Sequence, residues 1–271
     1  MPFNATKATV ENEGCNLHYW YQGSGPLLIM IPGGSGHAAQ FFPIFEYLDK
    51  HFTICTYDRR QMSASTVKEK AQLNPAQSAR DAEAITKAMG KERASIFGNS
   101  GGGIIAFQFA VSYPDALDHV MVHEAPSTIF LDDATYHLDR AFMLMELYRT
   151  QGAEAAGESF RTEMKGDEDW QSGALSNLKN MDNFWANEFM QFTIYCPDLR
   201  KIVDNKVSIS VAAGEKSRDA FYARTTFPQS EILACPRYVL PGNHSGYEHE
   251  PATFAPELLK AFNDMESRKN I

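Results

Sequence analysis

The sequence predicts an α/β fold, in which helices cover both faces of a mostly parallel sheet and a helical segment is inserted late in the chain. Short apolar runs alternate with helical patterns, an order typical of parallel sheets. Residues 127–204 interrupt this order, because they have helical spacing and no strand of their own. The 271 residues, 44% of them hydrophobic, suffice for one large core. We therefore expect a core domain over 1–126 and 205–271, and a helical cap over 127–204.

The individual elements follow from apolar runs and breakers. Residues 27–31 are all apolar, which is typical of a strand covered on both faces. A two-stranded antiparallel start is expected over 9–21, with a turn at Glu13-Gly14. Further strands are expected at 52–57, 94–97, 120–122, 207–213 and 238–240. Helices are expected at 41–48, 78–89, 104–111, 134–149, 175–192, 220–233 (broken by Pro228) and 254–265.

Composition excludes several classes of protein. A formal net charge of -9 argues against general nucleic-acid binding. The N-terminus lacks the apolar stretch of a signal peptide, and no apolar run is long enough to span a bilayer. The four cysteines are far apart without a CxxC spacing, which indicates reduced packing residues and neither disulfides nor a zinc site. We expect a cytoplasmic protein without metal, cofactor, membrane or nucleic-acid partner, and the chain is compatible with a homodimer.

The central motif is Gly98-Asn99-Ser100-Gly101-Gly102, which lies between a predicted strand and a predicted helix. Gly-x-Ser-x-Gly in this context is the nucleophile elbow, where a strained turn exposes the serine hydroxyl above the sheet. Glycines flank the serine because a side chain there would clash with the strand and helix. The N–H of Gly101, at the helix N-terminus, could face a developing oxyanion. The alternative is a Gly-rich turn that only joins two elements.

A second Gly-rich loop, residues 32–37, follows the strand at 27–31. Its spacing is neither that of Walker A nor that of GxGxxG, so a phosphate site is disfavoured. With a serine elbow later in the chain, Gly34 is expected to supply the second oxyanion N–H, with Ser35 beside the substrate. His37 is more typical of a wall or surface residue than of a base.

A serine nucleophile needs a base and an acid. His244 is the best base, because it lies just past the last strand and follows Ser100 in the chain. His249 is the alternative base.

The position where this topology usually places the acid holds Ser217, with Glu215 and Asp219 adjacent among charged residues. Glu124 directly ends an apolar strand, and burying its charge without a partner would be costly. We therefore rank Glu124 first as the acid, with a helix cap as its alternative role.

Two further groups are open to two interpretations. Arg59 and Arg60 follow a strand end, and could be solvated or capping residues or could bind an anionic substrate. Aromatic residues of the segment 175–192 could form the core of the cap or line a substrate pocket, and both roles are compatible. They are Phe184, Trp185, Phe189 and Phe192.

These motifs resemble the α/β-hydrolase superfamily over nearly the whole chain, and more narrowly the fungal zearalenone lactonases. The matching segments are Pro32-x-Gly34-x-Gly36, Gly98-x-Ser100-x-Gly102, His123-Glu124-x-Pro126, Trp185-Ala186 and Leu240-Pro241-Gly242-x-His244. The resemblance implies an eight-stranded, mostly parallel sheet with a cap, and no cofactor. It further implies a triad of Ser100, Glu124 and His244, an oxyanion hole from Gly34 and Gly101, and a cap tryptophan, Trp185, over the substrate. Of the other cap aromatic residues, Phe189 is expected to contact the substrate as well.

The predicted activity is hydrolysis of a hydrophobic carboxylic ester or lactone. A serine at position 100 favours acyl transfer, since dehalogenases and epoxide hydrolases of this shape need an aspartate there. Two alternatives remain open, namely a ligand receptor built on a hydrolase frame and a carbon–carbon bond hydrolase with the same triad.

Overall fold

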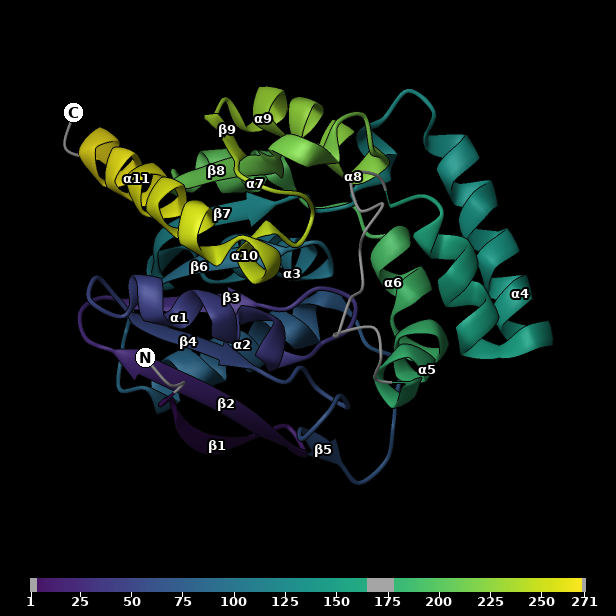
Figure 1. The fold of residues 1–271 in the computed structure, drawn as a ribbon, viewed down its shortest axis with the longest axis horizontal. Coiled ribbons are helices and arrows are strands. Elements are labelled where there is room, and N and C mark those ends of the chain that lie inside the picture. Colours follow the sequence, from purple (N-terminus) through teal and green to yellow (C-terminus); the bar gives the residue numbers. More distant parts are fainter. Residues whose placement is uncertain (1–3, 165–177, 270–271) are drawn as a thin grey trace.

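The computed structural model describes residues 4–164 and 178–269, and within them the strands form one nine-stranded sheet. The strand order is β1-β2-β4-β3-β6-β7-β8-β9, and β5 pairs with β2 (Figure 1). The strands are β1 (Thr6–Asn12), β2 (Cys15–Gly23), β3 (Leu27–Ile31), β4 (Thr53–Tyr57), β5 (Thr66–Val67), β6 (Ala94–Asn99), β7 (Leu117–His123), β8 (Ile209–Gly214) and β9 (Arg237–Leu240). The two-residue β5 is the strand that the sequence did not predict.

The predicted parallel arrangement is confirmed for β4, β3, β6, β7, β8 and β9, while β1, β2 and β5 pair antiparallel. Ile31 lies opposite Gly98, and Asn99 lies opposite His123. The carboxyl ends of these strands therefore meet at one edge of the sheet. Ligands of open parallel sheets bind at such edges. The loop at 32–37, the turn at Ser100, Glu124 and His244 each follow one of these strands.

Helices cover both faces of the sheet, which explains why β3 is apolar at every position. Leu27, Ile29 and Ile31 point into one hydrophobic cluster, and Leu28 and Met30 point into the other. The first cluster lies under α2 (Pro75–Ala88), α3 (Gly101–Ser112), α7 (Leu199–Asp204) and α9 (Thr226–Leu233). The second lies under α1 (Phe42–Leu48), α10 (Gly246–His249) and α11 (Pro251–Lys269).

The described residues between β7 and β8 contain helices and no strand. Figure 1 shows α4 (Ala134–Arg161), α5 (Leu178–Asn187) and α6 (Phe189–Thr193) beside one end of the sheet. We call these three helices the cap helices. α4 continues past the predicted end at residue 149, with a kink at Gly152 (φ 88°). Residues 175–177 of the predicted helix 175–192 lie outside the described residues. α7 packs against α3 and α9, and the cap boundaries 127–204 stay a prediction.

The helix predicted over 220–233 is interrupted, but not at Pro228, so this prediction was wrong. The break falls at Thr225, between α8 (Phe221–Arg224) and α9. The Thr225 hydroxyl donates to the carbonyl of Ala125, 2.8 Å away, on the segment after β7. Pro228 lies in the first turn of α9, where a helix needs no donor from the backbone nitrogen. Within the described part of the chain, no helix is long and apolar enough to cross a membrane.

Candidate active site

The turn at Ser100 has the geometry of an elbow. Ser100 joins β6 to α3 with φ 55° and ψ −122°, a left-handed conformation for a residue with a side chain. A Cβ atom on Gly98 would lie 2.3 Å from the carbonyl oxygen of Gly102. A Cβ atom on Gly102 would lie 2.1 Å from the carbonyl oxygen of Ile31. Only glycine fits at both positions, so the crossing of strand and helix depends on them.

Two backbone N–H groups lie beside this turn. Gly101 is the first residue of α3, and N–H groups in a first turn have no partner within the helix. The backbone nitrogen of Gly34 lies 3.6 Å from the point that a Cβ atom on Gly101 would occupy. The hydrogen bonds of the described residues include none from the Gly34 N–H. The loop of Gly34 is closed by a hydrogen bond of 2.9 Å from the Gly36 N–H to the Gly33 carbonyl.

The structure brings His244 and Glu124 together. His244 Nδ1 lies 2.6 Å from Glu124 Oε2, and the Gly214 N–H donates to Glu124 Oε1 at 2.8 Å. Both side chains are buried, Glu124 completely. Burial alone would raise the pKa of Glu124, but the hydrogen bond from His244 and the charge interaction with that imidazole help to lower it overall, so the carboxylate is ionised at neutral pH. A carboxylate at Nδ1 leaves Nε2 of His244 as the basic atom.

The imidazole of His244 is also held from the side. The ring of Tyr222, on α8, packs against it with centroids 4.2 Å apart. Ser100 and His244 line the same cavity. The hydrogen bonds of the described residues include none between them, and such contacts often tighten only when substrate is bound.

The alternative candidates for the acid and the base lie away from this pair. Glu215 and Asp219 are exposed, whereas Ser217 between them is buried. His249 is exposed. His37 lies 3.4 Å from Asp58 and is absent from the cavity wall. The geometry therefore favours Glu124 and His244 as the pair that could serve Ser100.

Residues 26–189, more than half of the chain, match the protein family described as alpha/beta hydrolase fold. The chain belongs to this family. It is 27% identical over 259 residues to the uncharacterized hydrolase YraK of Bacillus subtilis (strain 168), which covers 92% of this chain and 93% of the relative. It is 25% identical over 269 residues to a zearalenone hydrolase of Cladophialophora bantiana, covering 96% and 97% of the two chains.

Solved structures agree on the fold. A thermophilic esterase from Thermogutta terrifontis superimposes with a TM-score of 0.76 at 16% sequence identity, covering 97% of this chain and 99% of the esterase. The predicted membership of the superfamily is thus confirmed, and the protein is a hydrolase of the α/β-hydrolase family.

The cavity of this α/β-hydrolase is largely apolar, and the cap helices supply much of its wall. The apolar lining residues are Ile104, Pro126, Ala141, Leu144, Phe160, Met164, Met181, Phe184, Trp185, Phe189, Phe192 and Phe221. Ser35 lines it from the loop after β3. Trp185 is almost fully buried, and its indole N–H has no hydrogen-bond partner among the described residues. Glu248 also lines the cavity, and burial raises its pKa to about 7.

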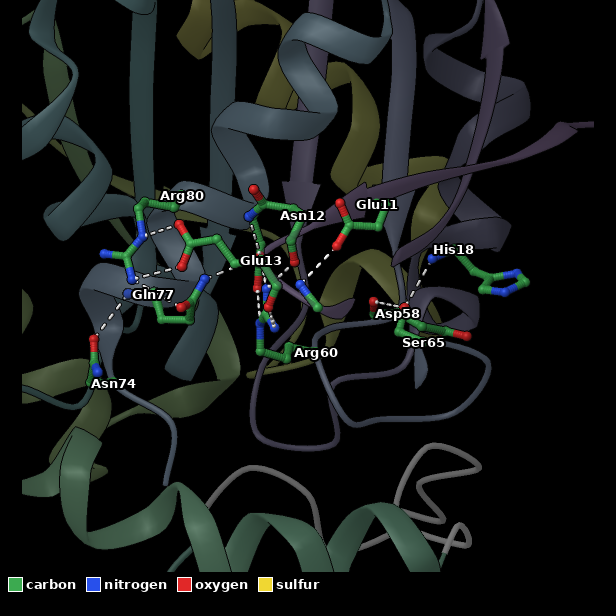
Figure 2. Close-up of polar contacts among 12 residues, drawn as sticks. Glu11, Asn12, Glu13, His18, Asp58, Arg60, Ser65, Asn74, Gln77 and Arg80 are labelled. Carbon is green, nitrogen blue, oxygen red and sulfur yellow. Dashed lines mark hydrogen bonds and ion pairs between the residues drawn. The ribbon is translucent and has the colours of Figure 1, made fainter. Parts of the chain in front are cut away.

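The two arginines after β4 have neither of their predicted roles. Arg59 is buried and forms a two-pronged ion pair with Glu188, which lies between α5 and α6. Arg60 is buried against Asp81 on α2. Figure 2 shows Arg60 beside the turn of the N-terminal hairpin, where it donates to the backbone carbonyls of Asn12 and Glu13. Each guanidinium group pairs with a buried carboxylate of the fold, because a buried charge needs a partner.

Several polar residues of the site were not predicted. Asn99, Tyr247 and Gln40 are buried and line the cavity. Asn99 and Tyr247 could have been suspected from their places beside the elbow serine and the late histidine, but nothing in the sequence marks Gln40. Within the described part of the chain, no group of three or more His, Cys, Asp or Glu side chains could hold a metal ion.

Proposed function

We propose that this α/β-hydrolase is a serine hydrolase that cleaves a carboxylic ester or lactone of a hydrophobic small molecule. His244 takes the proton of Ser100 as the hydroxyl attacks the carbonyl carbon, and then gives it to the leaving alcohol oxygen. A water molecule, deprotonated by His244, hydrolyses the resulting acyl-enzyme. Glu124 holds the imidazole in the required tautomer and stabilises its charged form.

The observation that carries this proposal is the buried contact of 2.6 Å between Glu124 and His244, at the cavity that also contains Ser100. A completely buried carboxylate on a histidine needs a reason, since removing its charge from water is costly. Orientation of a general base supplies that reason.

The oxyanion hole follows from the backbone around the elbow. The Gly34 backbone nitrogen lies close to Gly101, and among the described residues neither N–H group has an assigned hydrogen-bond acceptor. We assign both to the carbonyl oxygen of the substrate, which becomes negatively charged in the tetrahedral intermediate.

The substrate class follows from the cavity wall. An apolar cavity lined by Trp185 and Phe189 suits a hydrophobic acyl or ring system. The name of the relative from Cladophialophora bantiana makes the macrolactone zearalenone the first lactone to test.

A substrate panel tests the proposal. Purified protein is assayed with p-nitrophenyl esters of increasing acyl length and with zearalenone, and the Ser100→Ala variant is assayed in parallel. We expect steady turnover by the wild type and a loss of about 10⁶-fold in kcat in the variant. Ser267→Ala, at an exposed position of α11, is the matched control and should keep full activity. Ligand-induced thermal stabilisation without turnover would instead support a receptor.

A further inference from the structure

A chain of buried hydrogen bonds runs under the elbow to the loop after β3. His123 Nδ1 lies 2.6 Å from Asn99 Oδ1, and Asn99 Nδ2 lies 2.9 Å from the Tyr247 hydroxyl. The Tyr247 hydroxyl lies 2.7 Å from Gln40 Oε1, and Gln40 Nε2 lies 3.2 Å from Ser35 Oγ. All five side chains are at least nine-tenths buried.

One backbone carbonyl fixes the direction of this chain. Gln40 Nε2 also lies 2.9 Å from the carbonyl oxygen of His37, which can only accept a hydrogen bond. The amide nitrogen of Gln40 must therefore face His37 and Ser35, and its oxygen must face Tyr247. An amide nitrogen is not an acceptor, so Gln40 donates to Ser35 and not the reverse.

The remaining bonds follow from that orientation. Because Gln40 Oε1 accepts, the Tyr247 hydroxyl donates to it, and the Tyr247 oxygen accepts from Asn99 Nδ2. Asn99 Oδ1 then accepts from Nδ1 of His123. Burial lowers the pKa of His123 to about 4, so the ring is neutral and carries its one hydrogen on Nδ1. Burial raises the pKa of Tyr247, which keeps its proton. Every hydrogen bond thus points from His123 toward Ser35.

The hydroxyl of Ser35 is the end of this chain. Its oxygen accepts from Gln40, and among the described residues its own hydrogen has no acceptor. The backbone carbonyl of Ser35 is separately fixed by Asn180 Nδ2, 2.8 Å away on α5. Ser35 lines the cavity with Ser100 and directly follows Gly34. A buried donor without an acceptor is costly, so the hydrogen is available to a ligand.

We propose that Ser35 is a catalytic residue whose hydroxyl donates a third hydrogen bond to the substrate carbonyl oxygen as it becomes an oxyanion. Gln40 is the positioning residue, since its amide forces the Ser35 hydrogen toward the cavity. This inference rests on the proposed serine hydrolase function, and adds the requirement that the reacting group presents an acceptor oxygen to Ser35.

The test compares kcat and KM for a p-nitrophenyl ester in Ser35→Ala, Ser35→Thr and Gln40→Glu. We expect Ser35→Ala to lower kcat about 10²-fold with little change in KM. Ser35→Thr keeps the donor and should recover most of the rate. Gln40→Glu should resemble Ser35→Ala although the serine is present, because a carboxylate accepts the Ser35 hydrogen and turns it from the cavity. Thermal unfolding of each variant shows whether it is folded.

A transition-state analogue gives a second measurement. An aryl trifluoromethyl ketone forms a tetrahedral oxyanion on a catalytic serine, so its inhibition constant in Ser35→Ala should rise by the factor by which kcat falls. A kcat within about threefold of wild type, or a rise in KM alone, overturns the role of Ser35. The proposed function is judged separately by Ser100→Ala: if wild type and that variant both lack turnover, the hydrolase proposal fails.

Discussion

Ser100 and Glu124, two of the three proposed triad residues, both have left-handed backbone conformations, with φ of 55° and 51°. Such conformations are unfavourable for residues with a Cβ atom, and they persist where the surrounding structure fixes them. Here the edge of the sheet fixes both conformations. The Ser100 N–H donates to the His123 carbonyl at 2.9 Å, and the Glu124 N–H donates to the Ala212 carbonyl at 3.0 Å. The strand ends thus impose the strain that presents both side chains to the site.

The substitution Glu124→Gln tests whether Glu124 is the acid of the triad. Glutamine keeps the size of the side chain and an acceptor for Gly214, but it cannot stabilise a charged imidazole and can hold His244 in the wrong tautomer. We expect kcat to fall about 10⁴-fold, with far-UV circular dichroism unchanged.

The matched controls are Glu215→Gln and Asp219→Asn, which remove the two exposed rival carboxylates. Both should keep kcat within about twofold of wild type, as surface substitutions usually do. If either control loses activity while Glu124→Gln keeps it, the acid is assigned to the wrong strand.

At the scale of elements, Arg59 connects three segments that are distant in the chain. It follows β4, donates to the Gly33 carbonyl at 2.6 Å in the loop after β3, and pairs with Glu188 between the cap helices α5 and α6. Asn180 on α5 adds a second connection, because it binds the carbonyl of Ser35 and the N–H of Ser63. The loop proposed to hold the oxyanion is therefore fixed by the cap helices as well as by the sheet.

Removal of one partner of this ion pair should be costly. Arg59→Met leaves the Glu188 carboxylate buried and unpaired, so we expect the free energy of unfolding in urea to fall by about 3–5 kcal/mol. Glu188→Gln leaves the Arg59 guanidinium buried without a counter-charge, so it should lower the free energy of unfolding by a similar amount. The double variant Arg59→Met/Glu188→Met should lose less than either single variant, because no charge is left buried.

The exposed pair of Arg80 and Glu13 is the comparison, and Arg80→Met should cost about 0–1 kcal/mol. Single variants of the buried pair that cost no more than Arg80→Met would show that Arg59 does not hold these segments together.

The sequence predicted elements well where the cause is local. The apolar run of β3 and the turn at Glu13-Gly14 are read directly from neighbouring residues, and both lie where they were expected. The break at Thr225 was missed because it depends on a contact with Ala125, distant in the chain. The burial of Arg59 was missed for the same reason, since its partner Glu188 lies in the cap region.

For the whole molecule, the parallel sheet decides how much of the site was predictable. The order of parallel strands brings the loops after β3, β6, β7 and β9 to one edge, so Ser100 and His244 could be grouped from chain order and strand ends. Ranking Glu124 above Glu215 and Asp219 as the acid needed the further argument that a buried charge requires a partner. The series of hydrogen bonds from His123 to Ser35 could not be predicted in this way, because it pairs side chains such as Gln40 and Tyr247 from opposite ends of the sequence. Only tertiary packing sets those contacts, and they decide which way the Ser35 hydroxyl points.

The site of covalent modification shows directly whether Ser100 is the nucleophile. The protein is inactivated with a fluorophosphonate ester, which phosphonylates an activated serine, and the adduct is located by peptide mass spectrometry. We expect one adduct per chain, on Ser100, with ester turnover lost in proportion to labelling and no labelling of Ser100→Ala. Complete modification of a different residue, or full ester turnover by a chain modified at Ser100, would contradict this expectation.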